Sequence, residues 1–283
     1  YMKSRKTTAA NGEPLPESVI IETNARIREH RIQLGISFLA VCIFLFLWYL
    51  AVRFEWINPK YVATPFQVLE TFVKKFYDVT PDGGTLPMHF WASLKVVLIG
   101  FVLAVLIGTP IGLLTGYFRT ADDLIYPIFE LIRPIPPLAW TPLAIIWMGL
   151  GSSAKAFLIF LASFVPCVIN SYTGIRLTNP VRINVAKTFG ASKWEIFSTV
   201  CVPSAMPMVF AGIKIAIGNA WTTVVAAELL ASASGLGYMI QQGRTYSRSD
   251  VIIVGMFAIG ITGSIFTALV GKLENKIVPW RKK

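Results

Sequence analysis

The chain has 283 residues, of which 54% are hydrophobic and 14% are charged. A soluble domain carries about 25% charged residues, so the composition is that of a membrane protein. The formal net charge of +11 does not require nucleic acid as a partner, because Lys and Arg gather between apolar runs, where they set membrane topology. The three cysteines have the spacing of neither a metal site nor a disulfide framework, so neither is expected.

Six apolar segments are long enough to cross a membrane, which takes about 20 residues of helix. They cover residues 34–52, 90–118, 124–148, 154–175, 206–230 and 251–273. Residues 1–32 are expected to form a cytoplasmic tail that ends in a short amphipathic helix, and residues 33–283 to form the membrane domain. The excess of Lys and Arg on one side places both termini and the loop 176–203 in the cytoplasm.

Two segments carry helix patterns, one before the second span and one within it. Residues 66–77 place apolar side chains on one helical face, which is typical of a helix at the membrane surface. Within the second span, Gly108, Gly112 and Gly116 repeat every fourth residue, and this spacing predicts close packing against another helix.

The third expected span is interrupted by prolines, and residues 119–123 before it read as a polar turn. Pro136 and Pro137 remove backbone donors, and irregular backbone at membrane depth is tolerated only inside protein or along a watery cavity. This segment is therefore expected to line a pathway through the membrane or to gate it. Glu130 and Arg133 lie three residues apart, so they either form an ion pair or leave Arg133 facing the pathway to attract an anion.

Three other side chains in the spans have two interpretations each. Glu228 either holds a polar network near an outer gate or caps toward the membrane interface. Trp140 and Trp221 either supply bulky gate side chains or pack and anchor as tryptophan often does.

A polar, basic stretch, residues 184–207, separates the fourth and fifth spans. Apolar residues near helical spacing define one face, and polar residues define the other. The apolar set is Ala186, Phe189, Trp194 and Phe197, and the polar set is Lys187, Ser192, Lys193 and Glu195. Gly190 lies between them, where glycine costs about 1 kcal/mol in a helix, so it predicts a turn or a close approach by a partner. The stretch is either a docking surface for a soluble protein or an ordinary basic loop.

The same stretch resembles the EAA loop of ABC-importer permeases, whose pattern is E-A-A-x3-G-x9-I-x-L-P. Gly190 and Pro203 keep the family's spacing, whereas Asn184 replaces the acid and Val185 the first alanine. Further runs at residues 130–142, 189–192, 224–229 and 235–239 resemble the permeases of the taurine, aliphatic sulfonate, nitrate and bicarbonate importer group, most of all those of taurine and sulfonates.

The resemblance implies an all-α membrane protein with six transmembrane helices, the type I ABC importer permease fold and a cytoplasmic coupling-helix loop. It implies a bacterial inner-membrane homodimer that works with two cytoplasmic ATPase subunits and a periplasmic or lipid-anchored binding protein. The chain itself would hold no cofactor, since ATP and Mg²⁺ would bind the ATPase subunits, and it would not be an enzyme.

Two sets of residues follow from this resemblance together with the patterns above. The expected ATPase-coupling residues are Ala186, Phe189, Gly190, Ala191, Ser192, Lys193 and Trp194. The expected pathway or gate residues are Glu130, Arg133, Pro136, Pro137, Trp140, Trp221 and Glu228.

The expected solute is a small anion or zwitterion such as taurine, with nitrate, bicarbonate or an aromatic acid as alternatives. A membrane-embedded enzyme would need clustered intramembrane His or Asp, which the sequence lacks. A proton-coupled secondary carrier is the other alternative, and it would show inverted repeats and a titratable relay.

Overall fold

The structure is a computed structural model that describes residues 17–58, 61–230 and 232–279, and the regular elements in these ranges are helical. The chain divides into two compact units, Tyr1–Pro65 and Phe66–Lys283. The first unit contains α1 (Glu17–Arg53), one continuous helix of 37 residues. The expected short tail helix and first span are thus parts of a single helix, because no proline separates them. The rest of the expected tail, residues 1–16, lies outside the described residues.

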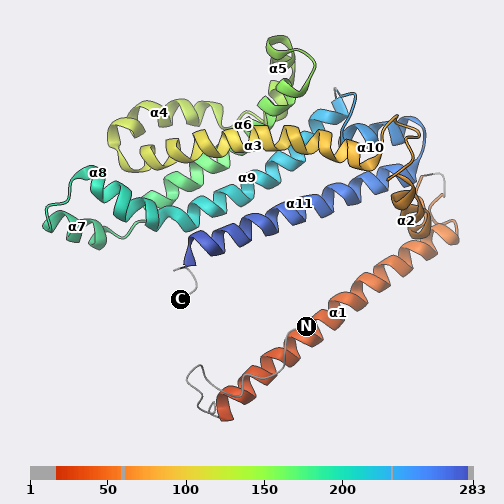
Figure 1. Ribbon diagram of the computed structural model, residues 1–283, viewed down its shortest axis with the longest axis horizontal. Helices are drawn as coiled ribbons and strands as arrows, with labels where there is room; N and C mark the ends of the chain where they lie inside the picture. The colour runs from red at the N-terminus through yellow and green to blue at the C-terminus, as the bar shows by residue number, and fades with distance from the viewer. Residues whose placement is uncertain (1–16, 59–60, 231, 280–283) are drawn as a thin grey trace. The chain divides into compact units, whose positions relative to one another are not determined.

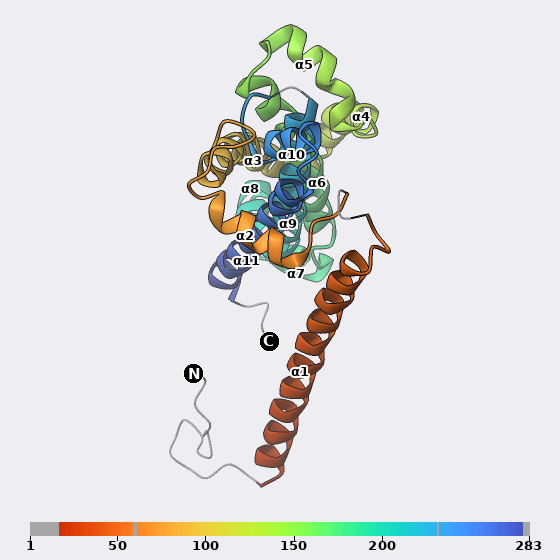
Figure 2. The ribbon, with the colours of Figure 1, turned by 90° about the vertical axis from the view of Figure 1, so that its right-hand side faces the viewer.

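The second unit is built around three long helices that lie side by side: α3 (Leu86–Tyr117), α6 (Ser152–Arg176) and α9 (Val202–Leu230) (Figures 1 and 2). The predicted glycine contact is confirmed, because Gly112 of α3 lies against α6 without room for a side chain. A Cβ built on Gly112 would lie 2.3 Å from the carbonyl oxygen of Val168. The small residues therefore bring the two backbones into direct contact.

A fourth long helix, α11 (Ser249–Ile277), packs against α9 and α10 (Leu236–Thr245). The expected surface helix is present as α2 (Pro65–Lys74), and the Thr71 hydroxyl ties it to α11 by donating to Oδ2 of Asp250 at 2.7 Å. The segment that connects α9 with α11 thus contains a helix of its own, α10.

Among the described residues, five helices are long and apolar enough to cross a membrane. The third expected span is not one of them, since it is divided into α4 (Arg119–Ile132), a 3₁₀-helix (Pro137–Trp140) and α5 (Thr141–Met148). The break follows Arg133, where Pro136 and Pro137 cannot donate backbone hydrogen bonds, and α5 turns away from α4 (Figure 1). The polar turn expected at residues 119–123 is instead the first turn of α4.

The polar stretch between the fourth and fifth spans is a helical hairpin. It consists of α7 (Pro180–Thr188), a turn, α8 (Lys193–Glu195) and a π-helical segment (Ile196–Cys201) that leads directly into α9. The helix that contains the fifth span therefore begins at Lys193, earlier than residue 206. The π-helical turn just before Pro203 shifts the hydrogen-bond register, which accommodates a residue without an N–H.

Candidate translocation pathway and coupling hairpin

An apolar cavity of about 850 Å³ lies between α4, the proline-rich break, α6 and α9. Four of the seven predicted pathway residues line it: Arg133, Pro136, Pro137 and Trp140. Most other lining side chains are Ile, Leu, Val and Phe, and the further polar ones are Asn219, Thr222 and Thr223. The irregular backbone therefore borders a cavity, as backbone of this kind must at membrane depth.

Glu130 and Arg133 form an ion pair at the end of α4. Nη1 of Arg133 donates to Oε1 of Glu130 at 2.6 Å, and the two side chains are about equally exposed, at 41% and 43%. Arg133 also lines the cavity, so its ion pair with Glu130 does not remove it from the cavity wall. A guanidinium has five N–H donors, and within the described residues Nε and Nη2 of Arg133 have no hydrogen-bond partner.

The polar wall on α9 was missed by the sequence reasoning. Three polar residues share one helical face here, because Thr222 and Thr223 follow Asn219 by three and four positions. This spacing within an apolar span is the sequence signal that could have predicted the polar wall. Nδ2 of Asn219 lies 3.4 Å from the carbonyl oxygen of Ala162. That carbonyl is free to accept because Pro166, four residues later, has no N–H.

Trp221 and Glu228 of α9 lie outside the cavity lining. Trp221 is buried, and its Nε1–H donates to the carbonyl oxygen of Ile259 on α11 at 2.8 Å. The carboxylate of Glu228 is buried too, and it accepts from the Ser93 hydroxyl at 2.8 Å and from the Gly237 N–H at 2.9 Å. Glu228 therefore holds a polar network that connects α9 with α3 and α10.

The turn at Gly190 is confirmed. Gly190 has φ +82°, a left-handed conformation that favours glycine, and its N–H donates to the carbonyl oxygen of Lys187 at 2.9 Å. Ser192 then begins the next helix with reciprocal bonds to Glu195: its N–H donates to Oε2 at 2.7 Å, and its Oγ accepts from the Glu195 N–H at 3.3 Å. The hairpin is thus fixed by its own backbone caps.

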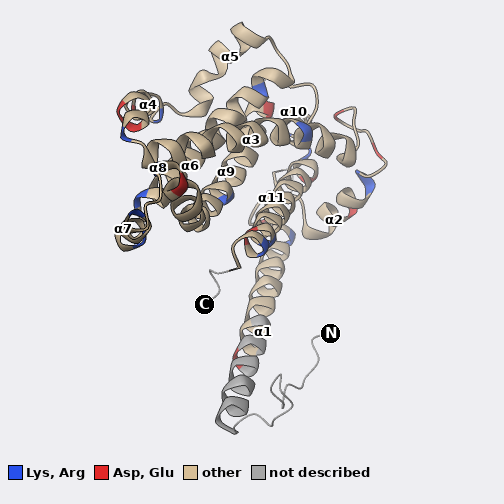
Figure 3. Cartoon of the chain, turned by 60° about the vertical axis from the view of Figure 1, so that its left-hand side comes forward, with Lys and Arg blue, Asp and Glu red and all other residues tan. Residues whose placement is uncertain are grey.

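The expected single apolar face is divided between the core and the surface. Phe197 is buried, and Trp194 stacks on Phe118 with ring centres 6.1 Å apart while staying 61% exposed. Phe189 is 86% exposed. Ala186 and Val200 help to line a shallow groove between α7 and the following helix. In Figure 3, basic residues gather on α7, while the long helices carry few charges. The hairpin therefore offers exposed aromatic side chains beside positive charge.

The chain matches known proteins along most of its length. Residues 108–282 match the family model described as "Binding-protein-dependent transport system inner membrane component". The taurine transport system permease protein TauC of Escherichia coli (strain K12) is 35% identical over 251 residues, which cover 88% of this chain and 90% of that protein. The nitrate import permease protein NrtB of Synechocystis sp. (strain ATCC 27184 / PCC 6803 / Kazusa) is 32% identical, over 86% of this chain and 89% of that protein.

Two further comparisons agree on relationship and fold. The putative aliphatic sulfonates transport permease protein SsuC of Bacillus subtilis (strain 168) is 32% identical over 80% of each chain. A chain of the MetNI methionine ABC transporter in an inward-facing conformation superposes with a TM-score of 0.54 at 17% identity, over 67% of this chain and 92% of that one, which shows the fold alone. By its sequence and its helical fold, this chain belongs to the binding-protein-dependent transport system inner membrane components and is an ABC importer permease of the taurine, sulfonate and nitrate group.

Proposed function

We propose that two copies of this chain form the pathway of an ATP-driven importer for a small sulfonate such as taurine. The observation that carries the proposal is the position of Arg133, which brings a guanidinium with unused donors to the lining of an otherwise apolar cavity. The planar guanidinium fork suits oxyanions, to which it donates paired hydrogen bonds. The relatives named for taurine and aliphatic sulfonate transport support the same class of solute.

The hairpin would couple ATP hydrolysis to the pathway. Two cytoplasmic ATPase subunits, which would hold ATP and Mg²⁺, would dock on the two hairpins and contact Phe189, Gly190 and Trp194. The residues between them, Ala191, Ser192 and Lys193, would complete the contact together with Ala186. Because the hairpin continues directly into α9, its displacement would move the wall that carries Asn219 and Thr223.

The importer would lie in the bacterial inner membrane, with both termini and the hairpin of this chain in the cytoplasm. A periplasmic or lipid-anchored binding protein would deliver the solute from the other side. The excess of Lys and Arg around the hairpin and the chain ends supports this orientation. Trp140 borders the cavity and would act at the gate, while Trp221 and Glu228 would support the gate from behind.

Nitrate is the competing solute, because one relative is named for nitrate import. The partner binding protein distinguishes the two, since it selects the solute before the permease receives it. We expect taurine or another small sulfonate to raise the melting temperature of the purified binding protein, and nitrate to leave it unchanged. A binding protein that is stabilised by nitrate alone would refute the sulfonate assignment and leave the importer assignment standing.

Variants of the ion pair test the role of Arg133 in the permease. We expect Arg133→Lys to keep part of the taurine uptake and Arg133→Ala to lose it, with normal amounts of protein in the membrane. If Arg133→Ala fails to fold while the Glu130→Ala/Arg133→Ala double variant folds and transports, Arg133 serves only the ion pair.

A further inference from the structure

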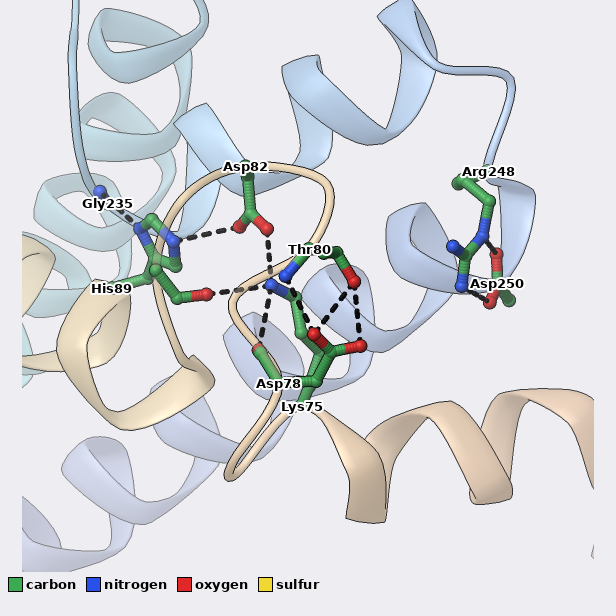
Figure 4. A network of polar contacts seen from close by, with 9 residues as sticks. Lys75, Asp78, Thr80, Asp82, His89, Gly235, Arg248 and Asp250 are labelled. Atoms are coloured by element: carbon green, nitrogen blue, oxygen red, sulfur yellow. Dashed lines mark hydrogen bonds and ion pairs between the residues drawn. The ribbon is translucent and has the colours of Figure 1, made fainter.

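A buried polar cluster (Figure 4) lies where the segment between α2 and α3 meets α10, at the end of the bundle opposite the hairpin of α7 and α8 (Figure 1). Lys75 and Asp82, from the segment between α2 and α3, form a buried ion pair, and Nζ of Lys75 also donates to the Gly84 carbonyl oxygen at 2.7 Å. Nε2 of His89 lies 2.8 Å from Oδ2 of Asp82. Burial raises the pKa of Asp82, but the contacts with His89 and Lys75 outweigh it and hold that pKa below its ordinary value.

The cluster supplies acceptors for the first turn of α10. The N–H groups at the start of a helix have no partner within the helix. Here the Gly235 N–H donates to Nδ1 of His89 at 3.1 Å, and the Leu236 N–H donates to Oγ of Ser93 at 2.8 Å. The Gly237 N–H donates to Glu228, to which the Ser93 hydroxyl also donates. Three side chains from α3 and α9 thus cap α10.

Gly235 is a position in this turn where both the backbone conformation and the close fit require glycine. Its φ of +122° lies in the left-handed region. A Cβ built there would lie 2.2 Å from the carboxylate carbon of Glu228. The backbone of the turn therefore rests directly on the Glu228 carboxylate, with no room for a side chain at this position.

We propose that His89, Ser93 and Glu228 are positioning residues of the transport cycle that clamp the first turn of α10 to α3 and α9, and that this clamp needs a neutral His89. The role of these three residues in transport rests on the proposed function. Its mechanical basis is the continuous helix from Lys193 through α9 to Glu228, because a displacement at the hairpin then reaches α10 through the clamp.

The hydrogen-bond directions fix the required state of His89. Nδ1 accepts from the Gly235 N–H, so the neutral ring carries its hydrogen on Nε2, which faces Asp82. An imidazolium donates at both nitrogens and cannot accept, so a proton on Nδ1 removes the bond to Gly235. Acid favours the imidazolium over the neutral ring, so lowering the pH tests this bond.

Other charged and titratable groups face the imidazole from the elements packed around it. They are Lys75 and Asp82 before α3, Glu228 on α9 and Tyr238 on α10. Lys155 on α6 is a further cation near Glu228. A variant that changes only the imidazole is therefore needed to assign acid sensitivity to it. His89→Asn is suitable because its Oδ1 takes the place of Nδ1 as an acceptor, and an amide does not gain a proton at the pH values of the test below. His89→Gln is its counterpart, since its amide nitrogen takes the place of Nε2 and supplies no acceptor for Gly235.

Hydrogen exchange tests the clamp without reference to transport. The full chain in nanodiscs is exchanged at about pH 7.5 and about pH 5.5, and the rates of residues 235–237 are corrected for intrinsic exchange. In the wild type, we expect the protection of these backbone N–H groups against exchange to fall about tenfold or more at the lower pH. We expect this protection to stay constant in His89→Asn and to be low at both pH values in His89→Gln. Constant protection in the wild type, or an equal fall in the wild type and His89→Asn, would overturn the proposal.

Taurine uptake tests the role of the clamp in transport. Proteoliposomes contain the chain with its ATPase and binding protein, at the same two pH values on both sides of the membrane. We expect wild-type uptake to fall more steeply with acid than His89→Asn uptake while ATP hydrolysis continues. Equal falls in the two proteins would overturn the role in transport. Absence of wild-type taurine uptake at both pH values would instead count against the proposed substrate, and the exchange result would stand separately.

Discussion

Gly112 is the closest of the α3 glycines to α6, and replacing it with alanine should separate the two helices. A Cβ at this position would lie 2.3 Å from the carbonyl oxygen of Val168 and 2.8 Å from the Cβ of Ser171. Favourable contacts between carbon atoms lie at about 3.5–4.0 Å, so the backbones must move apart by roughly 1 Å. Overpacking of this kind costs about 1–3 kcal/mol.

Gly260→Ala in α11 is the matched control. Among the described residues, no atom beyond the neighbouring turns of its own helix lies within 4 Å of a Cβ built on Gly260. This substitution therefore adds the same methyl group to a long helix without a clash. Alanine favours helix over glycine by about 1 kcal/mol, and both variants gain this contribution. The difference in the free energy of unfolding between Gly112→Ala and Gly260→Ala therefore isolates the packing cost, about 1–3 kcal/mol.

Equilibrium unfolding of the purified chain in mixed detergent micelles measures the difference. We expect Gly112→Ala to unfold at a lower denaturant concentration than the wild type, and Gly260→Ala at the same or a higher one. Equal midpoints for the two variants would mean that α3 and α6 do not pack through this glycine, and the reasoning from small-residue spacing would be wrong.

Three further predictions concern the polar cluster and the hairpin. Lys75→Met should lower the free energy of unfolding by about 3–5 kcal/mol, because it leaves the Asp82 carboxylate buried without its cation, and a Lys75→Met/Asp82→Asn double variant should recover part of that loss in the same assay. Since the pKa of Asp82 is lowered in the fold, its ionisation stabilises the chain fully above about pH 3.9 and less as the pH falls through the lowered value. The stability difference between wild type and Asp82→Asn should then shrink only in strong acid, and a difference that shrinks near neutral pH would contradict this. Gly190→Arg should abolish uptake and ATPase co-purification without unfolding the chain, whereas Gly190→Asn should retain both. Asparagine tolerates the positive φ, and among the described residues no atom beyond the chain neighbours lies within 4 Å of the added Cβ. Normal uptake in Gly190→Arg would exclude close docking at this turn.

Features that depend on local sequence were predictable. The long apolar segments predicted the spans of α3, α6 and α11, and the fourfold glycine spacing predicted the contact at Gly112. The cost of Gly190 in a helix predicted the turn of the hairpin. Four of the predicted pathway residues line one cavity because the proline-rich segment that carries them forms a single irregular wall. Each of these signals lies within a few residues of the structure that it determines.

Features that depend on long-range packing were not predictable. No local pattern singles out His89, which directly precedes the second apolar segment, yet it caps Gly235, which is 146 positions away in the chain. Ser93 and Glu228 are separated by 135 positions, and only the packing of α3 against α9 brings them together. The boundaries of α1, α4 and α9 also differed, because helices continued through polar segments that the hydropathy pattern marked as turns or tails.

Transport by a purified, reconstituted complex tests the central proposal most directly. The chain is placed in proteoliposomes with its ATPase subunit inside, and radiolabelled taurine is supplied with the binding protein outside. We predict taurine accumulation that requires internal ATP and the ATPase subunit and that persists when the proton gradient is collapsed. Taurine accumulation by the chain alone, driven by a proton gradient without ATP, would contradict the account and identify a secondary carrier.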